Sequence, residues 1–242
     1  MHDGEVDELE SRSALRDPDQ VAATFARLAL EMHDADGVEE TVETVVEFAL
    51  QAVDCQYAGV ALYARGGNPE VPAATDPTVA EIYRFQMDGE AGPLVECMRT
   101  QTTVMVPDTT SEPRWPEWAK KVLELGVRSV LDVPLRTAAG TVGVLGLYSV
   151  EPDAFGPDAE AIAHILARHA SVAVATARRE QNLNLAVDAR KLVGQAMGIL
   201  MERYGLDADR AFLVLKRYSQ QTNTKLHDVA RELIDTRSLP RS

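Results

Sequence analysis

The stretch from Asp158 to Tyr204 most limits the folds open to this chain, because it holds no proline and only two glycines, Gly194 and Gly198. A proline inside a helix breaks it, and a glycine weakens it. The stretch therefore predicts one continuous helix, about 65–70 Å long at a rise of about 1.5 Å per residue. A buried helix of one large domain is the alternative, but the polar run at 178–182 disfavours it. We expect the helix to join two domains.

Charge divides the chain along this helix. Residues 178–242 hold twelve Lys or Arg and eight Asp or Glu, a net charge of +4, whereas residues 1–177 hold twelve and thirty, a net charge of −18. An acidic surface repels phosphates and a basic one attracts them, so the contrast indicates that the C-terminal part contacts nucleic acid. Surplus arginines on solvated helix surfaces are the alternative interpretation.

Three amphipathic helices are predicted in the C-terminal part. The end of the long helix places Val193, Ala196, Met197, Leu200, Met201 and Tyr204 at helical spacing, and Gly205 ends it. Asp207 can cap a second helix, and Thr224 can cap a third. The residues expected to be buried on these two are Ala211, Phe212, Leu215, Tyr218 or Ser219, Leu226, Val229, Ala230, Leu233 and Ile234. Three such helices bury little apolar surface alone, but they can form a compact bundle when a neighbouring domain or a dimer partner supports them.

These helices resemble the ANTAR family in order and spacing. The resemblance is carried by Val193–Arg203, Ala211, Phe212, Leu215, Arg217, Asn223, Lys225, Leu226 and Asp228–Ala230. It implies a three-helix RNA-binding output module of bacterial regulators, which binds paired hairpins in nascent messenger RNA and prevents premature transcription termination. This chain has Met197 where many members have lysine, which removes one possible phosphate contact.

The polar faces of the three helices supply candidate RNA-binding residues. Gly194 and Gly198 lie one turn apart and leave a bare backbone surface that RNA, or another helix, could approach closely. Arginine and lysine can hold phosphates, and glutamine can bond base edges or ribose hydroxyls. A merely solvated face is the alternative. The candidates are Arg190, Lys191, Gln195, Gly198, Arg210, Lys216, Arg217, Gln220, Lys225 and Arg231.

Helix and strand patterns alternate over residues 20–177. The acidic stretch at 1–19 has few core residues and is expected to be a disordered or loose arm. Helices are expected at 21–32, after Asp36, and at 77–87, 93–101 and 115–125. Strands are expected at 57–64, 70–75, 103–107, 127–136 and 141–150, with a hairpin connection at 65–68.

The last two strands resemble the closing strands of a GAF domain through Arg128–Leu135 and Gly143–Ser149, and the order of elements over 20–175 agrees. The resemblance implies a PAS-like α+β sensory domain, in which an antiparallel sheet with flanking helices encloses a small-molecule cavity. We therefore expect a GAF sensor at 20–177 and, at 178–238, a three-helix ANTAR bundle linked by the long helix. The expected cavity lining is Val60, Leu62, Trp115, Trp118, Val130 and Asp132, although these residues could instead simply fill the core.

Signatures of catalysis are missing from the sequence. There is no Walker loop, nucleophile elbow, kinase or phosphatase motif, and the histidines are scattered. Cys55 and Cys97 are expected to be buried thiols rather than a metal knuckle or a disulfide. We expect no enzyme activity, no metal and no cofactor. Without a signal peptide or an apolar run of about eighteen residues, we expect a cytoplasmic protein that makes no membrane contact.

The sequence thus predicts an RNA-binding transcription antitermination regulator under the control of a GAF sensor. A homodimer is expected, because Leu183, Ala186, Val193, Met197 and Leu200 fall near the heptad spacing of a parallel coiled coil. The alternative is an interaction module whose C-terminal helices bind a protein or DNA, with the GAF domain as a dimerisation platform.

Overall fold

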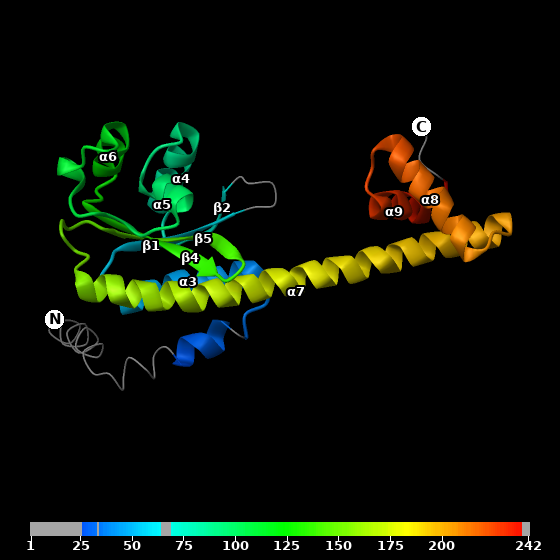
Figure 1. Ribbon diagram of the computed structural model, residues 1–242, viewed down its shortest axis with the longest axis horizontal. Helices are drawn as coiled ribbons and strands as arrows, with labels where there is room; N and C mark the ends of the chain where they lie inside the picture. Colours follow the sequence, from blue (N-terminus) through cyan, green and yellow to red (C-terminus); the bar gives the residue numbers. More distant parts are fainter. Residues whose placement is uncertain (1–25, 33, 64–68, 239–242) are drawn as a thin grey trace, which may run out of the picture. The chain divides into compact units, whose positions relative to one another are not determined.

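The computed structural model of the chain describes residues 26–32, 34–63 and 69–238 (Figure 1). It divides into two compact units, the first ending at Arg178 and the second beginning at Arg179. The predicted arm at 1–19, the start of the predicted helix at 21–32 and the predicted connection at 65–68 lie outside the described residues. The rest of that first helix is present at 26–32.

The first unit is built on one antiparallel sheet of five strands in the order β2-β1-β5-β4-β3. All five predicted strands are confirmed: β1 (Tyr57–Tyr63), β2 (Pro69–Ala74), β3 (Val104–Val106), β4 (Ser129–Thr137) and β5 (Gly140–Ser149). β4 and β5 form a tight hairpin that closes where Thr137 pairs with Gly140. Gly140 has a φ of 132°, a conformation that glycine adopts without a steric cost.

Helices cover both faces of this sheet. α3 (Gly37–Ala52) and the first part of α7 (Pro157–Tyr204) lie on one face (Figure 1). α4 (Pro77–Gly89), α5 (Pro93–Thr100) and α6 (Pro116–Glu124) lie on the other. Successive strand residues point to opposite faces, so Leu131 and Val133 enter the first core and Val130 enters the second. The expected α+β fold is confirmed.

The single long helix predicted from the lack of proline is also confirmed, since α7 is continuous over 48 residues. Pro157 is its first residue, a position where the missing N–H would have no partner within the helix. Gly205 follows its last residue with a φ of 62°, the left-handed conformation that commonly ends helices.

The second unit is a bundle of the end of α7 with α8 (Ala208–Thr222) and α9 (Leu226–Thr236). Asp207 caps α8 as predicted, because its carboxylate accepts a hydrogen bond of 2.8 Å from the N–H of Arg210. Asn223, with a φ of 52°, ends that helix. The buried core of the bundle is Ala196, Leu200, Ala211, Leu215, Val229, Ala230 and Leu233.

The predicted core of the bundle was wrong at Phe212, and two apolar residues at the end of α7, Met201 and Tyr204, are exposed as well. Phe212, Met201 and Tyr204 are 38%, 37% and 59% exposed. Successive helix residues are about 100° apart, so Phe212 and Met201 lie beside the buried stripe rather than on it. Tyr204 is the last residue of α7, where the helix has no further turn to cover it.

Two smaller expectations were also wrong. Thr224 does not cap α9, because Lys225 occupies the cap position and the Thr224 hydroxyl donates instead to the carbonyl of Thr222, at 3.3 Å. Cys55 is only half-buried, whereas Cys97 is buried as expected, and both are free thiols.

Among the described residues, no helix is both long and apolar enough to cross a membrane, and no group of acidic, cysteine or histidine side chains could hold a metal ion.

Candidate functional site

The outward face of α8 carries the strongest set of polar candidates. Ala211 and Leu215 are fully buried against the other two helices, and this packing turns Lys216, Arg217 and Gln220 toward solvent. Lys216 and Gln220 are four residues apart, so they are neighbours on the helix surface. Two cations and an amide on one exposed face can together contact phosphates and base edges.

Within the described residues, ion pairs involve two of the seven cationic candidates. Lys191 lies 3.1 Å from the carboxylate of Asp188, and Arg210 lies 3.4 Å from that of Asp207. The remaining five make no ion pair with any described carboxylate: Arg190, Lys216, Arg217, Lys225 and Arg231. These five cations can bind phosphate without first breaking an ion pair. Binding to them therefore costs less free energy than binding to Lys191 or Arg210.

The glycine surface on α7 is open. A Cβ placed on Gly194 or Gly198 would meet no atom within 4 Å among the described residues, and both glycines are exposed. The alternative expectation, that another helix packs there, is therefore not met by any described helix of this chain. The bare backbone remains accessible to a partner molecule.

All ten predicted RNA-binding residues are exposed, on the three helices of the bundle. No side-chain hydrogen bond or ion pair between described residues joins any two of them. The structure therefore supports their accessibility and groups Lys216, Arg217 and Gln220 on one face. It does not join the ten into a single contact network.

Phe212 is the residue that sequence reasoning misplaced. It is exposed beside Leu213, which is 60% exposed, and it precedes Lys216 by one helical turn. An exposed aromatic ring next to cations is the arrangement on which an unpaired base can stack. The signal in the sequence was the stripe of Ala211, Leu215 and Tyr218, which already completes the buried face without Phe212.

The sheet face under α4–α6 holds a buried polar cluster in the first unit. A Cβ placed on Gly146 would lie 2.7 Å from Oδ1 of Asp132 and 2.8 Å from Oη of Tyr148, and it would collide with Oη of Tyr83. Only glycine leaves room for these three side chains to converge. The hydroxyl of Tyr83 donates to the carbonyl of Gly59 at 2.9 Å, and the rings of Tyr83 and Tyr148 meet edge to face.

The Asp132 carboxyl at the centre of this cluster is fully buried, and neither of its oxygens has a hydrogen-bond partner among the described residues. Burial without a partner disfavours the charged form and raises the pKa of Asp132 to about 8. Burial first, and then the Asp132 carboxylate, raise the pKa of the Tyr83 hydroxyl. Oη of Tyr148 and Nε1 of Trp118 also lack partners in the described structure.

The six residues of the predicted cavity lining do not all lie on one face of the sheet. Val60 and Leu62 point to the opposite face of the sheet, into the core shared with α3 and α7. Trp118 and Val130 belong to the core under α4–α6, with Trp115 packed against it. Both faces of β1 are apolar, so its sequence could not indicate which residues face which helices.

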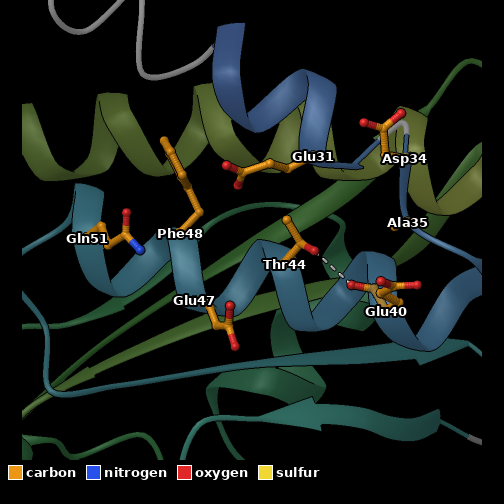
Figure 2. A pocket seen from close by; sticks show the side chains of 8 residues that line it. All are labelled: Glu31, Asp34, Ala35, Glu40, Thr44, Glu47, Phe48 and Gln51. Carbon is orange, nitrogen blue, oxygen red and sulfur yellow. Dashed lines mark hydrogen bonds between the residues drawn. The ribbon is translucent and has the colours of Figure 1, made fainter.

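A different cavity, of about 320 Å³, lies between α3 and the segment that precedes it (Figure 2). Four carboxylates line it, from Glu31, Asp34, Glu40 and Glu47. Figure 2 shows Thr44 beside Glu40, whose carbonyl accepts a hydrogen bond of 3.0 Å from the threonine hydroxyl. A concave surface of this charge repels phosphate, so it does not serve a nucleic acid.

Comparisons with known proteins match both units. A GAF domain model matches residues 35–175, and an ANTAR domain model matches residues 181–234. No curated protein sequence matches the chain.

Three solved GAF domains are similar to the first unit. The GAF domain of an Acinetobacter phosphoenolpyruvate-protein phosphotransferase is 16% identical, with a TM-score of 0.52, over 67% of this chain and 97% of that one. The corresponding domain from Coxiella burnetii is also 16% identical, with a TM-score of 0.52, over 67% and 96%. A cyanobacteriochrome GAF domain is 17% identical, with a TM-score of 0.51, over 61% and 94%. At these identities the likeness shows the fold alone.

Proposed function

The chain belongs to the GAF domain family and carries a C-terminal ANTAR domain, and from this premise we propose that it is a transcription antitermination regulator that binds paired hairpins in nascent messenger RNA. An ANTAR domain is an RNA-binding output domain and a GAF domain is a sensory domain, so both are regulatory in kind rather than catalytic. We assign the sensor to residues 20–177 and the RNA-binding part to residues 178–238.

The observation that carries this proposal is the outward face of α8. Lys216 and Arg217 are exposed cations without a described carboxylate partner, and Gln220 and Phe212 stand beside them. Cations hold the RNA backbone, the amide reads base or ribose groups, and the ring stacks on an unpaired base of a loop. The other candidates on α7 and α9 extend the contact: Arg190, Lys191, Gln195, Gly198, Arg210, Lys225 and Arg231.

A small-molecule site of the sensor belongs on the α4–α6 side of the sheet. Asp132, Tyr148 and Trp118 each present a buried polar atom without a partner, and a ligand with matching donors and acceptors would satisfy these atoms. We therefore retain Trp115, Trp118, Val130 and Asp132 in this site and exclude Val60 and Leu62.

A homodimer is the proposed working form. Ile165, Val172, Leu183 and Val187 are large apolar residues exposed on α7 in the single chain. Pairing of two α7 helices would remove these side chains from water, which is favourable at about 25 cal/mol per Å² of apolar surface. Sedimentation of the full chain tests this proposal: replacement of Val172 and Leu183 by glutamate is expected to yield a monomer.

Crosslinking in cells tests the RNA proposal. The protein is crosslinked to RNA in cells that make it, and the bound RNA is sequenced. The expected result is an enrichment of paired hairpins that precede transcription terminators, and these RNAs should bind the purified protein more tightly than duplex DNA of the same sequence. Equal competition by duplex DNA would favour the alternative DNA-binding module, and an absence of enriched RNA would favour a protein-binding module.

A further inference from the structure

A second cavity of the first unit, of about 440 Å³, lies at the β3 side of the sheet against α7. The pairing of β3 with β4 ends at Val104 and Asp132. Pro134 follows two residues later and has no N–H to donate to a further ladder bond. The segment 101–103 is therefore not paired with β4, and residues of α7 line the space between them.

The side chains that line this cavity are rich in hydrogen-bond donors. Arg136 comes from β4, His164 and Arg168 come from α7, and hydroxyls come from Thr102 and Thr103. Ser171 also lines the cavity, but its hydroxyl donates to the carbonyl of Ala167. Nε2 of His164 lies 3.2 Å from Oγ1 of Thr103 and 3.6 Å from the carboxylate of Glu160. Arg136 donates to the carbonyl of Gln101 at 3.5 Å, and neither Arg136 nor Arg168 has a carboxylate partner among the described residues.

The two arginines of this cavity differ from the ion-paired cations of the first unit, because they have no described carboxylate partner. Five described cations of the first unit are ion-paired: Arg27, Arg99, Arg114, Lys121 and Arg128. Arg178 donates to the carbonyl of Tyr63. The remaining four have no described carboxylate partner, and they are Arg84, Lys120, Arg136 and Arg168. Two of these four line one cavity together with a histidine, in a part of the chain with a net charge of −18.

We propose that this cavity is a binding site for a small organic phosphate, separate from the site on the α4–α6 side of the sheet. Each guanidinium can donate two parallel hydrogen bonds to phosphate oxygens. The threonine hydroxyls can reach the remaining oxygens, and a concave wall concentrates the positive field of Arg136 and Arg168. A phosphomonoester has the charge and the number of oxygens that these groups can bind, and the cavity volume is in the range of small-ligand sites.

Titration calorimetry on the full chain, without RNA, tests this site at constant ionic strength. The probes are glycerol 3-phosphate, succinate as a dicarboxylate of similar size, and glycerol as the neutral control. We expect binding of glycerol 3-phosphate, weaker binding of succinate and no binding of glycerol. Binding of succinate at equal or higher affinity, or no binding of glycerol 3-phosphate, would overturn the phosphate assignment.

Variants locate the binding. Arg136→Ala and Arg168→Ala are each expected to reduce the affinity for glycerol 3-phosphate about tenfold or more, since a charged hydrogen bond contributes about 1.5–3 kcal/mol. Arg84→Ala removes the same charge from an exposed helix position away from the cavity and is expected to change nothing. All three positions are exposed, so the fold should survive, and unchanged circular dichroism checks this. Equal affinities in all three variants would overturn the site, whatever the protein does with RNA.

Discussion

At the residue scale, burial changes the chemistry of the Asp132 carboxyl. Its folded-state pKa of about 8 lies above the value near 4 that is expected in the unfolded chain. Below about pH 4 the carboxyl is protonated in both states, so it has no effect on the pH dependence of stability. Between about pH 4 and pH 8 the folded state binds an extra proton, and the free energy of unfolding falls as the pH rises.

Asp132→Asn is therefore expected to stabilise the first unit, and by a growing amount as the pH rises from 5 to 8. The asparagine cannot ionise, so it removes a slope of up to about 1.4 kcal/mol per pH unit. Urea unfolding at pH 5, 6, 7 and 8 measures the difference between the variant and the parent chain. A difference that does not change with pH would show that Asp132 titrates normally in the folded protein.

Phe212 yields a second prediction, because it is partly exposed where the core was expected. Phe212→Ala should weaken RNA binding about tenfold or more, since stacking contributes about 1–3 kcal/mol per base. Its cost in stability should be well below that of Leu215→Ala, a fully buried residue whose loss costs about 2–5 kcal/mol. Thermal unfolding and gel shifts of both variants measure the two effects. If Phe212→Ala destabilised the bundle as much as Leu215→Ala did, the ring would be a core residue.

At the scale of elements, helix and strand positions followed closely from the sequence. The absence of proline correctly predicted α7, and apolar runs between turn signals predicted every strand of the sheet. The sequence could not predict which core a side chain enters when neighbouring positions are all apolar. β1 is apolar on both faces, so only packing decides that Val60 enters the core with α3 and α7. Likewise, Phe212 and Ala211 are adjacent and both apolar, and only the placement of α7 and α9 decides which is buried.

Helix caps provide a matched pair of variants at this scale. Asp207→Ala removes the hydrogen bond to the N–H of Arg210 and should cost the bundle about 1 kcal/mol. Thr224→Ala should cost less, because the Thr224 hydroxyl bonds to a carbonyl within the turn and caps no helix. Urea unfolding of the bundle compares the two variants. A larger loss for Thr224→Ala than for Asp207→Ala would contradict the observed start of α9.

At the scale of the whole molecule, charge and family assignment agree. The acidic part of the chain is the GAF unit, and the basic part contains the ANTAR helices, with α7 shared between them. Composition alone indicated which part contacts nucleic acid. It could not identify the face, because seven cationic candidates are exposed on three helices and only the structure separates the paired ones from the free ones.

The salt dependence of RNA binding tests the central claim, that the α8 face binds RNA phosphates. The RNA is a hairpin identified by crosslinking in cells, and its binding is measured by gel shift between 50 and 200 mM salt. Three proteins are compared: the parent chain, the double variant Lys216→Ala/Arg217→Ala, and the control double variant Arg84→Ala/Lys120→Ala. Both double variants remove two positive charges. We predict that the first binds more weakly and loses about two counterions from the salt slope, whereas the control keeps the parent slope. Equal affinity and equal slope in all three proteins would contradict the account.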